Sequence, residues 1–119
     1  DAIPYWDYDA PVTKETPRDA SAASVTASAL IELSTMVPDG QKYLDYAEKI
    51  LKSLSSDAYL AKVGDNQGFI LMHSVGSLPN GSEIDTPLNY ADYYYLEALK
   101  RFMELKKLRV ENGELRVIQ

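Results

Sequence analysis

The chain has 119 residues, 45% of them hydrophobic, with 12 basic and 18 acidic side chains and no cysteine. This length fits one globular domain, and the lack of cysteine excludes disulfides, zinc–thiolate sites and cysteine nucleophiles. A net charge of −6 argues against a nucleic-acid partner, and no stretch has the ~20 apolar residues of a membrane span. The chain begins at Asp1 without a methionine or a leader, which predicts a processed product or a fragment.

The first 18 residues predict an extended loop. They contain three of the six prolines, and three clustered aromatic residues, Tyr5, Trp6 and Tyr8, alternate with acidic ones. Proline removes a backbone donor and fixes φ, so a helix is disfavoured here.

Two helices joined as a hairpin are predicted next. The first covers about residues 20–36, with Asp19 as its N-cap and with Pro38 and Gly40 beyond its end. Its predicted buried stripe is Ala22, Val25, Ala29, Leu33 and Met36. The second, over residues 41–54, is amphipathic, and the short linker makes the two helices antiparallel neighbours.

The middle of the chain predicts little regular structure. Residues 69–74 are apolar but few, so we expect a strand or an extended segment. Residues 76–87 hold two prolines and two glycines and predict a long loop. Loops of this length are usually functional or disordered.

A third helix is predicted from Leu88 or Asn89 to about Lys106. In residues 108–118, apolar and polar side chains alternate on both sides of the turn dipeptide Asn112-Gly113. This pattern predicts a small β-hairpin. The first two helices are predicted to form a hairpin, but the sequence offers no further helix that could form a hairpin with the third. An excised piece of a larger all-α assembly is therefore expected.

The only histidine, His73, has no His, Cys or closely spaced acidic partner in the sequence. It therefore fits no metal-site or catalytic-triad pattern, and both a structural role and a place beside a site remain open.

Aromatic rings next to carboxylates are typical of sugar sites, because flat rings contact the C–H faces of a sugar and acids bind its hydroxyls. The residues of this kind are Trp6, Asp7, Tyr8, Asp9, Asp85, Asn89, Tyr90, Asp92 and Tyr93. The structural alternative is that Trp6 anchors the loop and Asp92 caps the third helix.

Four motifs in order resemble the carboxyl-terminal third of the unsaturated glucuronyl hydrolases, glycoside hydrolase family 88. They are WDYDAP at 6–11, PRDASAA at 17–23, GFILMHSV at 68–75 and YADYYYLEAL at 90–99. The resemblance implies that residues 1–119 form the carboxyl-terminal part of one (α/α)6 barrel domain, a ring of six helical hairpins.

The resemblance also implies an activity, the removal of unsaturated uronic acid from oligosaccharides made by polysaccharide lyases. A vinyl ether double bond is hydrated with an aspartate as general acid and base. The family's two catalytic aspartates are expected upstream, so no catalytic residue, metal or cofactor is assigned here, and the isolated chain is expected to be inactive.

The resemblance places the loop after His73 beside the sugar. Ser77 matches a substrate-contacting serine, whereas Gly76 stands where relatives that act on glycosaminoglycans have a tyrosine, and their lysine is absent. The residues expected to contact substrate are Ser77, His73, Tyr93 and Trp6. Such a loop offers neutral hydrogen bonds without the stronger charge-assisted kind.

The alternative hypothesis is a non-catalytic helical module that binds other proteins. An upstream coding region of further helical hairpins would favour the enzyme, and a start codon near Asp1 would favour the module. The partner expected for the enzyme is an unsaturated uronic-acid oligosaccharide, with neither nucleic acid nor membrane, and the isolated chain is expected to self-associate. The lack of cysteine is compatible with a periplasmic or a cytoplasmic location.

Overall fold

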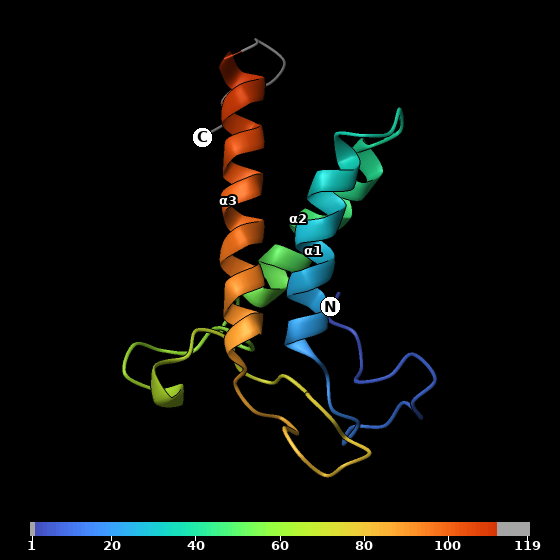
Figure 1. Cartoon of the computed structure of the whole chain (residues 1–119), viewed down its shortest axis with the longest axis vertical. Helices are drawn as coiled ribbons and strands as arrows, with labels where there is room; N and C mark the ends of the chain where they lie inside the picture. Colours follow the sequence, from blue (N-terminus) through green and yellow to red (C-terminus); the bar gives the residue numbers. More distant parts are fainter. Residues whose placement is uncertain (1, 112–119) are drawn as a thin grey trace.

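A computed structural model describes residues 2–111 of the chain (Figure 1). Its regular elements are α1 (Ala20–Ser34), α2 (Gln41–Leu54), the short 3₁₀ helix η1 (Asn66–Gly68) and α3 (Asn89–Glu111). This described part has no β-strand, only isolated bridges between extended residues. None of its helices is long and apolar enough to cross a lipid bilayer. The all-α prediction is thus confirmed.

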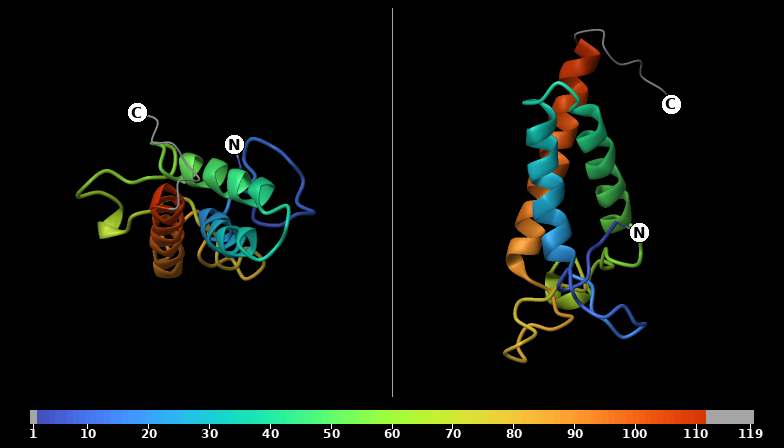
Figure 2. Two further views of the ribbon diagram at one scale, coloured as in Figure 1. Left: turned by 90° about the horizontal axis from the view of Figure 1, so that it is seen from above. Right: turned by 90° about the vertical axis from the view of Figure 1, so that its right-hand side faces the viewer.

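The predicted hairpin of α1 and α2 is present. The Asp19 carboxylate accepts a hydrogen bond from the Ser21 amide at 3.0 Å and so caps α1 as expected. The helix ends at Ser34, two residues before the predicted end, and α2 has the predicted bounds. Seen from above in Figure 2, α2 covers one side of the pair formed by α1 and α3.

Small side chains form the buried face of α1. Its buried residues are Ala20, Ser21, Ala23, Ser24, Ala27, Ser28, Ile31 and Ser34. Because most of these side chains are very short, the backbones of the neighbouring helices can approach α1 closely. The larger apolar residues of the core come from elsewhere, including Ile50 and Leu54 of α2, Leu71 of the extended segment and Ile3 of the amino-terminal loop.

The predicted buried stripe of α1 is wrong, because the structure turns that face outward. Val25 is 40% exposed and Met36 67% exposed, Ala29 is also exposed, and Ala22 and Leu33 are half-buried. Alanine, serine and valine surround this helix on all sides, so periodicity alone did not distinguish the two faces. The close approach of α2 and α3 selects the face with the smallest side chains instead.

Within residues 2–111, helix α3 has no antiparallel hairpin partner, as expected from the sequence, but it packs against α1 as a parallel neighbour. The two helices lie side by side in Figure 1 and begin at the same end of the molecule. Polar contacts supplement the packing, since Arg101 Nη1 donates to the carbonyl and hydroxyl oxygens of Ser28 at 3.1 and 3.0 Å. At the end of α2, the hydroxyls of Ser55 and Tyr95 are 2.7 Å apart.

The predicted terminal β-hairpin is wrong over residues 108–111, which continue α3 to Glu111. Leu105 and Leu108 line a groove with Ile31 of α1, so the apolar face of α3 extends past the predicted end. A helix keeps Leu105 and Leu108, three residues apart, on one side, whereas a strand would place them on opposite faces. The rest of the predicted hairpin lies outside the described residues.

We expect the stability contributed by Glu97 to depend on pH. Ser28 Oγ donates to Glu97 Oε1 at 2.5 Å, and this hydrogen bond, with the nearby Arg101 guanidinium, holds the pKa of Glu97 below its ordinary 4.5. A lowered folded-state pKa adds stability above about pH 4.5 that is lost as the pH falls through the folded value.

The loss of stability caused by Ser28→Ala should therefore be larger at pH 7 than at pH 3 in urea unfolding. Glu97→Gln is the control, because Ser28→Ala in that background should cost the same at both pH values. Equal costs at both pH values in the unmodified background would contradict the prediction.

Candidate functional site

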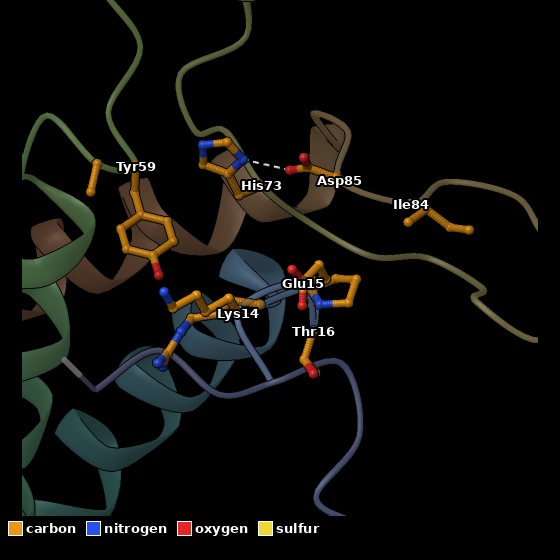
Figure 3. A pocket seen from close by; sticks show the side chains of 10 residues that line it. Lys14, Glu15, Thr16, Tyr59, His73, Ile84 and Asp85 are labelled. Atoms are coloured by element: carbon orange, nitrogen blue, oxygen red, sulfur yellow. Dashed lines mark hydrogen bonds and ion pairs between the residues drawn. The ribbon is translucent and has the colours of Figure 1, made fainter. Parts of the chain in front are cut away.

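A hollow of about 480 Å³ lies at the end of the molecule where α1 and α3 begin (Figure 3). Three separate stretches form it, the amino-terminal loop, the residues that follow α2, and the extended segment with its following loop. Its lining residues are Lys14, Glu15, Thr16, Pro17, Arg18, Ala58, Tyr59, His73, Ile84 and Asp85. One of the four predicted substrate-contacting residues, His73, is among them.

His73 has an acidic partner that its sequence neighbourhood does not reveal. Its Nδ1 lies 2.5 Å from Asp85 Oδ1, and the two side chains are 45% and 60% exposed. A carboxylate at Nδ1 fixes the orientation of the imidazole and leaves Nε2 as its other polar atom. An exposed, oriented imidazole differs from a buried structural histidine and can meet a ligand.

Both members of this pair have a left-handed backbone, with φ of 66° at His73 and 50° at Asp85. Non-glycine residues in this region cost about 1–3 kcal/mol each and persist where the surrounding structure imposes them, often at functional sites. The surrounding chain therefore imposes the backbone conformation that places the side chains of His73 and Asp85 opposite each other.

Tyr59 forms the buried wall beside His73. Their rings meet edge to face, with centroids 6.0 Å apart and planes at 85°. Burial raises the pKa of Tyr59, so its phenol stays protonated at neutral pH. The Met72 amide donates to the Tyr59 carbonyl at 2.8 Å, which fixes this wall to the segment that carries His73.

The amino-terminal loop supplies the cationic side of the hollow, Lys14 and Arg18. Arg18 Nη1 donates to the Ile3 carbonyl at 2.6 Å, Nη2 donates to the Tyr5 hydroxyl at 3.2 Å, and the guanidinium lies 4.4 Å from the centre of the Tyr5 ring. These contacts order the loop. The carboxylates of Glu15 and Asp85 line the same hollow, so it is the side formed by Lys14 and Arg18 that can offer charge-assisted hydrogen bonds to an anionic group.

Two aspartates at the starts of the parallel helices α1 and α3 hold the segment on either side of His73. Asp92 of α3 accepts hydrogen bonds from the amides of Ile70 and Leu71, both at 2.9 Å. These two bonds fix the start of the segment against α3. The Asp92 carboxylate therefore binds the segment that precedes His73, whereas the structural alternative from the sequence was that it caps the third helix.

Asp19 holds the other end of the segment. Its Oδ1 accepts from the Val75 amide at 3.1 Å as well as from the Ser21 amide, and the Ala20 amide donates to the His73 carbonyl at 3.0 Å. His73 is thus held between carboxylates from the first turn of α3 and the N-cap of α1. Residues 69–74 form no strand, as the isolated bridges at Leu71 and Ser74 show, and the left-handed backbone of His73 interrupts the extended segment that the sequence predicted.

The other three predicted contact residues lie apart from the hollow. Trp6 lines a second hollow of about 240 Å³ on the amino-terminal loop beside Ala22. Ser77 accepts a hydrogen bond from Asn80 Nδ2 at 2.9 Å within its own loop. Tyr93 is 60% exposed on α3, with its ring edge to face against Tyr94. Their contact with substrate stays a prediction.

Sequence reasoning missed the other polar members of the hollow. Asp85 was named among the sugar-site residues but was not paired with His73, because eleven residues of irregular loop lie between the two. Lys14 and Arg18 could have been identified from the sequence, since they are the only basic residues before Lys42. No sequence pattern pointed to Tyr59, because it follows α2 in a short irregular stretch.

Comparison with known proteins confirms the resemblance that the four motifs predicted. The chain is 50% identical over 105 residues to an unsaturated glucuronyl hydrolase of Formosa agariphila, a match that covers 88% of this chain and 26% of the relative. No protein-family model matches it.

Solved structures agree in sequence and in fold. A crystal structure of an unsaturated glucuronyl hydrolase specific for heparin superposes with a TM-score of 0.86 at 70% identity, over 88% of this chain and 28% of that one. A mutant unsaturated glucuronyl hydrolase of Streptococcus agalactiae in complex with dGlcA-GalNAc6S superposes with a TM-score of 0.76 at 31% identity, over 84% of this chain and 27% of that one. The helices are thus those of part of an (α/α)6 barrel, and the chain spans about a quarter of the length of the relatives it matches.

Proposed function

We propose that this chain is the carboxyl-terminal part of an unsaturated glucuronyl hydrolase and that residues 1–119 belong to one (α/α)6 domain. The observation that carries the proposal is the 70% identity and 0.86 TM-score over 88% of the chain to an enzyme described by that activity. Partial coverage of every matched relative fits a piece of a longer enzyme.

The reaction proposed for the parent enzyme is hydration of the vinyl ether double bond of a terminal unsaturated uronic acid. The resulting hemiketal then collapses and releases the sugar. An aspartate serves as general acid and base in this scheme, and we assign it to the part of the parent outside this chain. No acidic residue of residues 1–119 is therefore given a catalytic role.

The polar hollow supports a binding role for this chain. A uronic acid carries a carboxylate, and Lys14, Arg18 and His73 provide groups that stabilise a negative charge. We therefore propose that the hollow contributes to binding the anionic oligosaccharide. Contacts of the substrate with Ser77, Tyr93 and Trp6, which lie outside the hollow, stay predictions.

The test compares the isolated chain with the parent encoded by the full reading frame. A Δ4,5-unsaturated disaccharide loses its ultraviolet absorbance when the double bond is hydrated. We expect turnover by the parent and none by the chain alone. Turnover by the isolated chain would contradict the assignment of the catalytic aspartate to the missing part, and an inactive parent would favour the protein-binding module.

The substrate to test first is a disaccharide derived from heparin, because the 70% identical relative is described as specific for heparin. A chondroitin-derived disaccharide is the natural comparison, since other relatives are named for chondroitin disaccharides. We expect the parent to have the higher kcat/KM on the heparin-derived substrate.

We expect Ser77→Ala in the parent to lower kcat/KM by about two- to tenfold. The loss corresponds to one neutral hydrogen bond, which contributes roughly 0.5–1.5 kcal/mol. Ser56→Ala, at an exposed position outside the hollow's lining, is the control and should leave kcat/KM unchanged. If Ser77→Ala has no effect on any unsaturated oligosaccharide, Ser77 is only a turn residue.

A further inference from the structure

Further hollows follow the amino-terminal loop away from the polar hollow that contains His73. The next one, of about 560 Å³, shares Lys14, Thr16 and Arg18 with the polar hollow. It also shares Tyr5 with the hollow of about 240 Å³ that Trp6 lines, which we call the aromatic hollow. The lining of the aromatic hollow is Pro4, Tyr5, Trp6, Asp7, Tyr8 and Ala22. The three hollows therefore adjoin one another and form a track along the loop.

Hydrogen bonds order the loop that carries the aromatic hollow, which projects to one side of the helices (Figure 1). At the base of the loop, the Trp6 amide donates to the Pro17 carbonyl at 2.9 Å. At its tip, the Ala10 amide donates to the Asp7 carbonyl at 3.1 Å, and the Asp9 amide donates to Asp7 Oδ1 at 2.8 Å. Because the loop is ordered before a ligand arrives, binding costs less conformational entropy.

Tyr8 lies at the tip of this loop and is 89% exposed. Its ring is therefore available to a ligand, although it is held on an ordered turn. Tyr5 and Trp6 add two further rings to the same hollow. Aromatic rings with a polar neighbour suit a sugar, because the ring contacts the C–H face and the polar group binds the hydroxyls.

The two ends of the track differ in charge. Lys14 and Arg18 line the polar hollow, whereas Asp7 is the only charged residue among the described residues that line the aromatic hollow. An anionic sugar in the aromatic hollow would meet a carboxylate without a neighbouring cation, which is unfavourable. A neutral sugar can instead donate a hydroxyl to that carboxylate. The aromatic hollow is therefore suited to a neutral sugar.

We propose that the aromatic hollow binds a neutral sugar of an unsaturated oligosaccharide longer than a disaccharide, with the Tyr8 ring as its stacking surface. The inference rests on the proposed function, which assigns the polar hollow to the anionic part of the substrate. Pockets of about 300–1,000 Å³ hold a small ligand, so a disaccharide can fill the polar hollow of about 480 Å³. Only additional sugars would then extend along the track to Tyr8.

Substrates of two lengths test the proposal in the parent enzyme. One is a tetrasaccharide in which three neutral sugars follow the unsaturated uronic acid, and the other is the disaccharide formed by its first two sugars. We expect kcat/KM to be at least ~3-fold higher on the tetrasaccharide. Tyr8→Ala should remove this gain, with a loss in kcat/KM of about 3- to 10-fold on the tetrasaccharide and less than ~2-fold on the disaccharide.

Two further variants and a third substrate identify the cause of the gain. Tyr8→Phe keeps the ring and should keep at least about half of the gain. Tyr43→Ala removes a ring on the first turn of α2 that lines neither the polar nor the aromatic hollow, and it should leave the gain unchanged. A tetrasaccharide whose last two sugars carry carboxylates should show no gain over its disaccharide, because of the Asp7 carboxylate.

Equal kcat/KM of the unmodified parent on the disaccharide and the neutral tetrasaccharide would overturn the proposal. A gain that survives Tyr8→Ala would do the same, as would an equal gain on the anionic tetrasaccharide. These outcomes are separate from failure of the proposed function, which would appear as a lack of turnover of every unsaturated disaccharide by the unmodified parent.

Discussion

Asp92→Ala should lower the free energy of unfolding by about 3 kcal/mol. The change removes the two hydrogen bonds that the carboxylate accepts from the amides of Ile70 and Leu71. Hydrogen bonds to charged groups contribute about 1.5–3 kcal/mol each, and Leu71 is fully buried, so its amide would find no easy substitute. Urea unfolding at a concentration where the chain is monomeric measures the loss.

Two further variants identify the cause of this loss. Asp92→Asn keeps one acceptor oxygen and should have an intermediate effect. Asp45→Ala removes an exposed aspartate of α2 and should change stability by less than ~0.5 kcal/mol. If the amides of Ile70 and Leu71 exchange with deuterium no faster in Asp92→Ala than in the unmodified chain, Asp92 does not fix this segment.

Gly40→Ala should be comparably damaging, with an expected loss of about 3 kcal/mol. A Cβ at this position would lie 1.9 Å from the Ser34 carbonyl oxygen and 2.7 Å from its carbon, both backbone atoms. Overpacking against a well-packed neighbour costs about 1–3 kcal/mol, and here no flexible side chain can move aside. The turn between α1 and α2 would have to open.

The control for Gly40→Ala is Gly81→Ala, which has a positive φ of 68° but no atom near its Cβ position. Its cost should be the backbone penalty alone, about 1–2 kcal/mol. If Gly40→Ala and Gly81→Ala cost the same, the contact with Ser34 does not limit the hairpin.

The helices could be predicted because their signals are local. Asp19 as a cap and the amphipathic pattern of residues 41–54 depend on neighbours within one or two turns, and both predictions are confirmed. The sequence placed Gly40 in the turn after the first helix but did not show why glycine is required there. Its φ of −61° is ordinary, and the requirement comes from the close approach of Ser34 across the turn.

The buried face of α1 and the hollow could not be predicted, because both depend on contacts between distant residues. Every side of α1 offers small uncharged side chains, so only the approach of α2 and α3 decides which side is buried. The pairing of His73 with Asp85 requires two left-handed residues and a closed loop, which no spacing in the sequence indicates.

The shared direction of α1 and α3 has an electrostatic consequence. The peptide dipoles of each helix leave about half a positive charge at its first turn, and two parallel neighbours add these charges at the same end. The Asp19 and Asp92 carboxylates lie at these two first turns and more than offset them. The helix backbones therefore provide no net attraction for an anion at this end, and within the hollow any such attraction depends on Lys14 and Arg18 and is opposed by Glu15 and Asp85.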